Sequence, residues 1–238
     1  MGVEKVVDGV WLLRGDFRKA MNVYFLEDGD GVVQFDAGTK GMRKSARAAA
    51  QQLGGLKRVV LGHAHADHRG CAPYMGAPVY CHPDEVADAE SDAAIAPYFD
   101  LSQLPVAPVR WIYPFLLRRW DGGAVKIAGT VSEGDEVAGF GVLHFPGHAP
   151  GLIGLWRESD RVAIVSDVVY LVDSARLKPL PEGEASVPHP AWAWNHAKAK
   201  ESVRRLAALD PKVLCAGHDR PLRAESLRET LERAAERY

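Results

Sequence analysis

Short apolar runs alternate along the chain with longer amphipathic stretches, a pattern that predicts both strands and helices. In the first 35 residues, apolar and aromatic runs at 6–7, 10–13, 23–26 and 32–35 are separated by Asp and Gly residues. Runs of this length between turn-forming residues are typical of strands joined in hairpins. The N-terminal part is therefore expected to form antiparallel strands.

Three other stretches have helical patterns. Residues 42–53 are rich in Ala, Arg, Lys and Gln and end at Gly54-Gly55, which predicts a helix with a glycine stop. Residues 196–209 keep their larger apolar side chains on one side and follow Asn195, a suitable N-cap. The last helix places Leu227, Leu231, Ala234 and Tyr238 at steps of four, three and four. Strands and helices mixed in this way predict a layered α/β or α+β fold.

Residues 97–120 do not fit either pattern. Four prolines and six aromatic residues occur there: Pro97, Pro105, Pro108, Pro114, Tyr98, Phe99, Trp111, Tyr113, Phe115 and Trp120. Because proline interrupts the hydrogen bonding of a helix, the stretch is not expected to form one continuous regular helix. Long ordered excursions of this kind often wall a ligand pocket. The alternative is that these aromatic residues only cover the core.

Four apolar runs each stop shortly before a residue type that binds metal ions. The runs begin at Arg58, Val142, Val162 and Val213, and the residues that follow them are His63, His148, Asp167 and His218. Each run has the length and the β-branched content of a buried strand. Since functional sites of layered proteins gather on loops at strand ends, these four side chains are candidates for one shared site.

The first of these positions opens a dense motif, His63-Ala-His65-Ala-Asp67-His68. In an extended segment side chains two residues apart point to the same side, so His63 and His65 are expected to grip one ion. Asp67 and His68 are then placed to face a second ion after the chain turns. Imidazole and carboxylate ligands suit Zn²⁺, with Fe²⁺ or Mn²⁺ as alternatives. No cysteine takes part, which argues against a closed structural zinc site.

His148, Asp167 and His218 follow this motif in that order, and with this arrangement the sequence resembles the metallo-β-lactamase-fold hydrolases. The resemblance runs from Asp36-Ala37-Gly38, after an early strand, to Gly217-His218, and so covers nearly the whole chain. It implies an α+β fold of the αββα type, in which two mixed β-sheets pack face to face with helices on the outer faces. It also implies one metallo-β-lactamase-like domain over residues 1–238, with the metal ions at one edge of the sandwich.

The same resemblance implies two Zn²⁺ ions per chain. His63, His65 and His148 would hold the first ion, Asp67, His68 and His218 the second, and Asp167 would bridge them. Two close cations lower the pKa of a bridging water, so that a hydroxide is available near neutral pH to attack a polarised carbonyl. Each ligand must be deprotonated, so activity is expected to fail in acid.

Further residues take roles by resemblance or by position. Asp36 and Asp219 are expected to form hydrogen bonds around the ligands rather than to bind metal. Tyr170 follows the bridging aspartate by three residues, as in the N-acyl homoserine lactonases of the superfamily, and is a candidate oxyanion donor or else a packing residue. With Asp67 it completes the candidate catalytic pair. Trp111, Tyr113, Trp192 and Trp194 are the candidate pocket residues.

No metal-binding role is expected for the cysteines or for the remaining histidines. Cys71, where many relatives have glycine, is expected to be a small buried thiol, and the three cysteines to be free. Plain hydrogen-bonded roles are expected for the histidines outside the ligand set: His82, His144, His189 and His196.

Composition limits the classes of partner that the protein is expected to bind. The chain has 238 residues, 47% of them hydrophobic, and a net charge of −2, so it lacks the basic surplus that non-specific nucleic-acid binding needs. No stretch approaches about 18 uninterrupted apolar residues, and the N-terminal residues lack a signal-peptide core. A cytoplasmic enzyme acting on a small molecule is expected, without nucleic acid or membrane, as a monomer or homodimer.

Several substrates remain open at this stage. A dinuclear zinc hydrolase of a lactone or a thioester is expected first, although the basic and tyrosine residues that would bind glutathione are not recognisable. The alternatives are a mononuclear iron persulfide dioxygenase and a β-lactam hydrolase. Against the latter, no export signal is expected from the N-terminal residues, and Asp167 stands where some lactamases have Cys or Ser.

Overall fold

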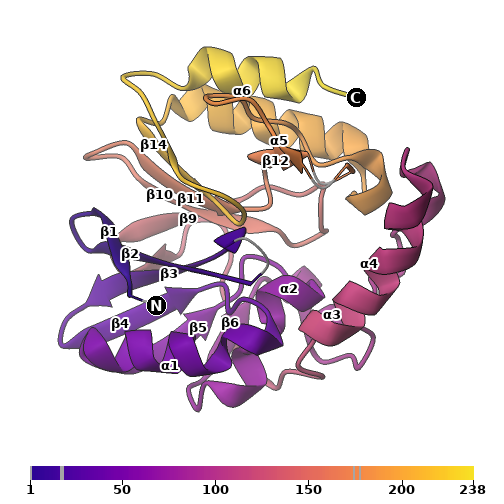
Figure 1. The fold of residues 1–238 in the computed structure, drawn as a ribbon. Helices are drawn as coiled ribbons and strands as arrows, with labels where there is room; N and C mark the ends of the chain where they lie inside the picture. The colour runs from indigo at the N-terminus through magenta and orange to yellow at the C-terminus, as the bar shows by residue number, and fades with distance from the viewer. Residues whose placement is uncertain (1, 17–18, 174, 177) are drawn as a thin grey trace.

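Two β-sheets packed face to face, with helices on the outer faces, form the structure of this protein, a computed structural model that describes residues 2–16, 19–173, 175–176 and 178–238 (Figure 1). The first sheet has the strand order β1 (Glu4–Val7), β2 (Val10–Gly15), β3 (Met21–Asp28), β4 (Gly31–Phe35), β5 (Leu56–Val60), β6 (Val79–Cys81) and β7 (Ile127–Thr130). Its first four strands are antiparallel, as predicted, and β4 to β7 are parallel.

The second sheet is mixed as well. Its order is β15 (Leu222–Arg223), β14 (Val213–Ala216), β11 (Val162–Ser166), β10 (Ile153–Arg157), β9 (Phe140–His144) and β8 (Glu136–Val137). Only the β11–β14 pair is parallel among these described strands. A separate ribbon pairs β12 (Val172–Asp173) with β13 (Lys178–Pro179). The αββα architecture expected from the resemblance is confirmed.

Three apolar clusters hold these layers together. Alternate side chains of one strand point to opposite faces of its sheet. In β3, Tyr24 and Leu26 join the cluster between the two sheets, whereas Val23 and Phe25 join the cluster under α1 (Arg43–Gln52). The third cluster lies between the second sheet and the two C-terminal helices. Because both faces of each sheet are covered, central strands such as β4 and β11 are buried along their whole length.

The two helices expected near the C-terminus are present. α5 (His196–Leu209) has the predicted bounds, and the Asn195 side chain accepts a hydrogen bond from the Lys198 amide at 3.1 Å. α6 (Arg228–Ala235) ends before Tyr238. Shorter helical segments are η2 (Lys40–Met42), α2 (Ala66–Arg69), η3 (Ala72–Tyr74), η4 (Pro83–Glu85), α3 (Val86–Ala89), η5 (Leu101–Gln103) and η6 (Pro190–Trp192). No helix in the described ranges is both long and apolar enough to cross a membrane.

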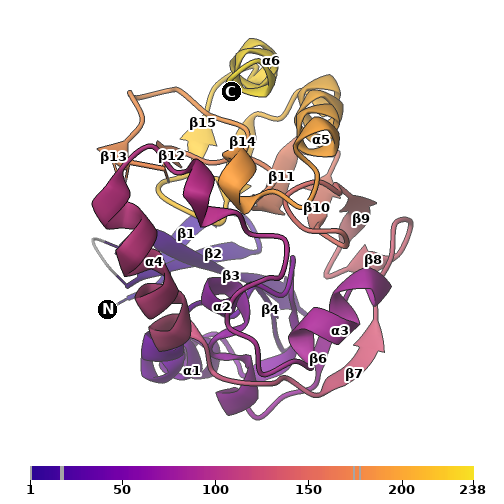
Figure 2. The same ribbon diagram turned by 90° about the vertical axis from the view of Figure 1, so that its right-hand side faces the viewer.

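The expectation for residues 97–120 needs a correction. The second half of this stretch is a regular helix, α4 (Ala107–Trp120), and it stands outside both sheets (Figure 2). Pro108 lies in the first turn, where an amide has no intrahelical acceptor to lose. Pro114 lies inside the helix and removes one hydrogen bond, while the flanking Tyr113 and Leu117 are buried and anchor the helix. Proline position, rather than proline number, decided the outcome.

Candidate metal centre

The candidate ligands lie just beyond four strand ends. His63 follows β5, His148 follows β9, Asp167 directly follows β11, and His218 follows β14. The carboxyl ends of β5, β11 and β14 meet at one edge of the sandwich, so short loops bring these side chains together. The remaining part of the motif turns into the single helical turn of α2, with His65 as its N-cap residue.

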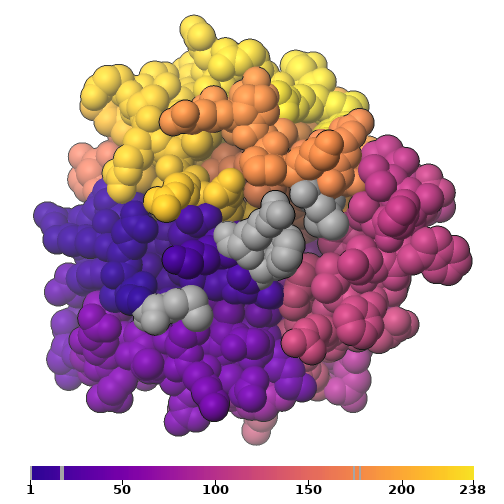
Figure 3. All heavy atoms as spheres, viewed as in Figure 1, coloured from indigo at the N-terminus to yellow at the C-terminus, as the bar shows by residue number. Residues whose placement is uncertain are grey.

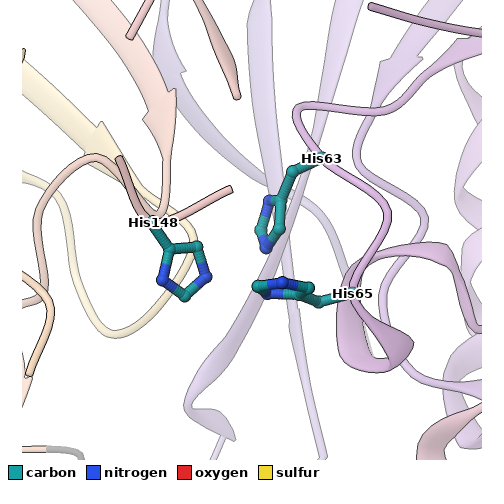
Figure 4. Close-up of side chains that lie close together, drawn as sticks. All are labelled: His63, His65 and His148. Carbon is teal, nitrogen blue, oxygen red and sulfur yellow. The ribbon is translucent and has the colours of Figure 1, made fainter. Parts of the chain in front are cut away.

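Three histidines form the first group of side chains. The ring centroids of His63 and His65 are 4.4 Å apart, and those of His65 and His148 are 4.5 Å apart. Their rings face a common space from two different loops (Figure 4). All three are buried, and one ligand atom from each lies within 4.8 Å of the others. The group can hold a metal ion.

A second group consists of Asp67, His68 and His218, whose ligand atoms also lie within 4.8 Å of one another. Asp167 lies between the two groups. One of its carboxylate oxygens is 3.6 Å from His148 Nε2 and 3.4 Å from His218 Nε2. Its other oxygen is 3.3 Å from His68 Nε2. The seven side chains predicted as ligands are thus brought together.

The backbone around Asp167 is shaped for close approach. A Cβ on Gly217 would lie 2.3 Å from Asp167 Oδ1, so only glycine fits beside this carboxylate. Ser166 has a φ of +47°, in the left-handed region that a serine rarely adopts. Such conformations persist where surrounding contacts hold them, and they gather at functional sites.

Each ring of the motif has one nitrogen engaged in a hydrogen bond. His63 Nδ1 lies 3.1 Å from Ser166 Oγ, and Ser166 Oγ donates to Asp36 Oδ2 at 2.6 Å. His68 Nδ1 lies 2.8 Å from the same Asp36 oxygen. His65 Nε2 lies 2.7 Å from the hydroxyl of Tyr98. These contacts leave His63 Nε2, His68 Nε2 and His65 Nδ1 for an ion, which is how partners around a site fix imidazole tautomers.

Several buried atoms of the site lack a hydrogen-bond partner among the described residues. They are His63 Nε2, His68 Nε2, both nitrogens of His148 and Asp167 Oδ1. A buried polar atom without a partner costs about 1–3 kcal/mol, so five such atoms at one place are unfavourable unless something binds them. Imidazole nitrogens and a carboxylate are the ligands that Zn²⁺ and related ions prefer. The residues present therefore fit divalent cations.

Burial and local charge set the protonation of the ligands. Burial lowers the pKa of His148 to about 4 and that of His63 and His65 well below the ordinary value, and neighbouring imidazoles contribute to these shifts. Burial alone would raise the pKa of Asp167, but His68 and His218 hold it well below its usual range. Near neutral pH the first group is therefore uncharged, and the carboxylate between the groups is ionised.

A cavity of about 550 Å³ opens beside the two groups. Its metal end contains His65, Asp67, His148, Asp167 and His218. Its apolar wall is formed by Met21, Phe99, Ile112, Tyr113, Leu116, Leu117, Trp120, Tyr170, Val172, Pro179 and Trp192. In the space-filling view, the surface of α4 borders the orange surface around β12 and β13 (Figure 3). Residues of the stretch 97–120 thus line this cavity.

Two of the four aromatic residues predicted for this pocket do not line it. Trp111 is 84% exposed, because it lies two residues, about 200° of helix rotation, from the inward-facing Tyr113. Trp194 is 40% exposed and carries the Lys198 ammonium 5.1 Å above its ring. Its backbone amide instead donates to the His148 carbonyl at 3.0 Å. Tyr113 and Trp192 do line the cavity.

Other predicted residues lie at the border of the site. Asp36 is buried and accepts hydrogen bonds from the Gly62 amide and Ser166. Asp219 lines the cavity rim and pairs with Arg14 at 2.9 Å. Cys71 is buried, and its thiol donates to the Thr39 carbonyl, away from the ligand groups.

Three residues with direct contacts to the ligand loops were not predicted for the site from the sequence, although Tyr98 was noted among the aromatic residues of 97–120. The buried Glu85 accepts hydrogen bonds from the Ala64 amide at 2.8 Å and from the Gly151 amide at 2.7 Å. It thus connects the loop that carries His63 and His65 with the loop that follows His148. Ser166 and Tyr98 hold imidazoles directly. No local pattern marks these three residues, because each contact joins distant parts of the chain.

Comparison with known proteins gives a consistent family match. The sequence profile of the Metallo-beta-lactamase superfamily matches residues 18–218. The "Probable metallo-hydrolase YflN" of Bacillus subtilis (strain 168) is 27% identical over 247 aligned residues, which cover 91% of this chain and 87% of that protein. A crystal structure of the metallo-beta-lactamase family protein TTHA1429 from Thermus thermophilus has a TM-score of 0.67 at 24% identity, over 96% of this chain and 79% of that one.

Two relatives carry more specific names. The "N-acyl homoserine lactonase AiiB" of Agrobacterium fabrum (strain C58 / ATCC 33970) is 28% identical, with 74% of this chain and 61% of that protein aligned. The "Hydroxyacylglutathione hydrolase GloC" of Haemophilus influenzae (strain ATCC 51907 / DSM 11121 / KW20 / Rd) is 30% identical, with 48% of this chain and 50% of that protein aligned.

Proposed function

The chain belongs to the metallo-beta-lactamase superfamily and is a metal-dependent hydrolase, and from this premise we propose that it binds two Zn²⁺ ions and hydrolyses a small ester-like substrate. The observation that carries the proposal is the convergence of seven ligand side chains, five of whose buried polar atoms have no partner among the described residues. His63, His65 and His148 would hold one ion, and Asp67, His68 and His218 the other, with Asp167 between them.

When bound, the two cations supply Lewis acidity for the substrate carbonyl and a water of lowered pKa. The chain's own residues do the rest. Burial, together with the charges of Asp167 and Asp67, raises the pKa of Tyr170 well above its ordinary value, so its hydroxyl keeps its proton. The Tyr170 ring lies 5.8 Å from that of His148 and 5.7 Å from that of His218. We assign to it a hydrogen bond to the substrate oxygen on which negative charge develops.

Asp67 takes the second catalytic role. It lines the cavity, and burial raises its pKa above the ordinary value of an aspartate. Its Oδ2 lies 3.5 Å from His218 Nε2 and 3.7 Å from His68 Nε2. We propose that Asp67 helps to hold the second ion through Oδ2 and accepts, at its other carboxylate oxygen, the proton that hydrolysis releases.

The cavity wall favours a lactone over a glutathione thioester. An apolar wall accommodates an acyl chain, and AiiB is named as a lactonase of N-acylated substrates. Glutathione brings two carboxylates that need cationic partners. The rim provides Arg119 and Lys178, but Asp16, Asp173 and Asp219 lie on the same rim. We therefore propose an N-acylated lactone first and the thioester second, the latter matching the name of GloC.

Hydrolysis of an N-acyl homoserine lactone and of S-lactoylglutathione by the zinc-loaded protein, measured side by side, tests the proposal. Lactone opening much faster than thioester cleavage is expected. The test variant His148→Ala is expected to lose metal and activity. The matched control His144→Ala alters a histidine outside the seven ligands and is expected to keep metal and activity. Inactivity of the wild type on both substrates, or full activity of His148→Ala, would overturn the proposal. One iron per chain with oxygen uptake would favour a persulfide dioxygenase instead.

A further inference from the structure

Among the imidazoles of the motif, His65 is held differently from the others. His63 and His68 are fixed by Ser166 and Asp36, which belong to the sandwich itself. His65 is fixed by the hydroxyl of Tyr98, 2.7 Å from its Nε2. Tyr98 lies in the segment between α3 and η5 that leads into α4, the helix that walls the cavity. The orientation of one ligand ring therefore depends on the pocket wall.

The residues next to Tyr98 strengthen this connection. Phe99 packs edge-on against His65 with ring centroids 4.7 Å apart, and against Trp192 at 5.3 Å. The Asp100 amide donates to the Ala191 carbonyl at 3.1 Å. Tyr98, Phe99 and Asp100 thus connect the ligand His65 with η6, whose Trp192 also lines the cavity.

We propose, on the basis of the metal centre proposed above, that Tyr98 is a positioning residue for His65. The phenol oxygen accepts the proton on Nε2, which leaves Nδ1 with its lone pair toward the ion shared with His63 and His148. Without this partner no hydrogen bond fixes the tautomer or the rotation of the His65 ring, and only packing against neighbouring rings such as Phe99 remains. Both changes weaken its contribution to the first ion, since partners around a ligand are typically worth about 10–100-fold in metal affinity.

The test compares Tyr98→Phe with Tyr74→Phe in the full chain. Both substitutions remove one phenol oxygen, but the Tyr74 hydroxyl donates to the Gly122 carbonyl at 3.2 Å rather than to a ligand. The probe is Co²⁺, titrated into metal-free protein, with its visible absorption spectrum recorded alongside the affinity. Zn²⁺ affinity is measured by competition with a chelator, and the Nε2 proton of His65 is followed by nitrogen-edited NMR.

For Tyr98→Phe we expect the affinity for the first ion to fall about 10–100-fold, a changed Co²⁺ spectrum and faster exchange of the His65 proton. Tyr74→Phe is expected to match the wild type in all three. A lowered melting temperature of Tyr98→Phe with unchanged affinity and spectrum would reduce Tyr98 to a structural residue and overturn the inference, while the metal centre would stand. Failure of the wild type itself to bind Co²⁺ or Zn²⁺ would instead overturn the metal centre and the inference together.

Discussion

Arg69 directly follows the last residue of the metal motif, and its replacement offers a sharp test of how the site is held. The side chain is only 1% exposed. Its guanidinium donates to Asp121 through Nε at 3.1 Å and through Nη2 at 3.2 Å. It also donates to three carbonyls, those of Asp88, Ala89 and Ala93. Since Asp121 follows the last residue of α4, one side chain ties the motif to the pocket wall.

The expected loss in the free energy of unfolding follows from the groups that Arg69→Met leaves without a partner. The carboxylate of Asp121, 7% exposed, loses its cation, and breaking a buried ion pair on one side costs about 3–5 kcal/mol. Water can reach part of the carbonyl positions, because two of these hydrogen bonds are only partly buried. We therefore expect a loss of about 4 kcal/mol in the free energy of unfolding. For a chain of this size that lowers the melting temperature by about 8–16 °C.

The assay is urea unfolding of the metal-free protein, followed by tryptophan fluorescence and circular dichroism. The double variant Arg69→Met/Asp121→Leu removes the stranded carboxylate and is expected to lose only about 2 kcal/mol. Arg233→Met, in an exposed ion pair, serves as the control and is expected to stay within about 0.5 kcal/mol. A loss below about 1 kcal/mol for Arg69→Met, or a double variant that loses the sum of the single losses, would refute the reasoning.

Three further predictions concern the site. In Asp167→Asn a neutral amide replaces the carboxylate between the two ion groups, so at most one ion should survive dialysis by elemental analysis; two tightly held ions would contradict the bridging role. Tyr170→Phe should lower kcat about 100-fold with little change in KM, and an unchanged kcat would return Tyr170 to packing. Burial raises the pKa of Glu85 from 4.5 to about 7, although the Gly151 and Ala64 amides oppose the shift. Between pH 4.5 and about 7 the folded state therefore keeps a proton on Glu85 that the unfolded state has released. This contribution to the free energy of unfolding is complete below pH 4.5 and is lost as the pH rises through 7. The stability of the wild type relative to Glu85→Gln, both metal-free, should thus fall by about 3 kcal/mol between acid and neutral pH, and a difference independent of pH would contradict the shift.

The sequence predicts those parts of the molecule that depend on local pattern. The N-terminal antiparallel strands follow from apolar runs between turn residues, and α5 follows from its apolar face and the Asn195 cap. The candidate ligands could be predicted because four of them follow apolar runs and because one dense motif carries four of the seven. The αββα architecture came from the resemblance, since periodicity alone does not determine how sheets pack.

What the sequence does not predict depends on contacts between distant residues. Tyr98 is 33 positions from His65, Glu85 is 66 from Gly151, and Ser166 is 103 from His63. No periodicity marks such pairs. The pocket aromatics show the same limit, because Trp111 and Tyr113 differ only in their angle around a helix whose existence the prolines concealed.

The seven ligand side chains are proposed to form one dinuclear hydrolytic centre. The most direct test is titration of the metal-free protein with Zn²⁺ while hydrolysis of an N-acyl homoserine lactone is followed. Activity should be absent at the start, rise with added Zn²⁺ and level off at two equivalents per chain, with the same two ions found by elemental analysis. Hydrolysis that survives complete removal of metal, or that saturates at one equivalent, would contradict the account.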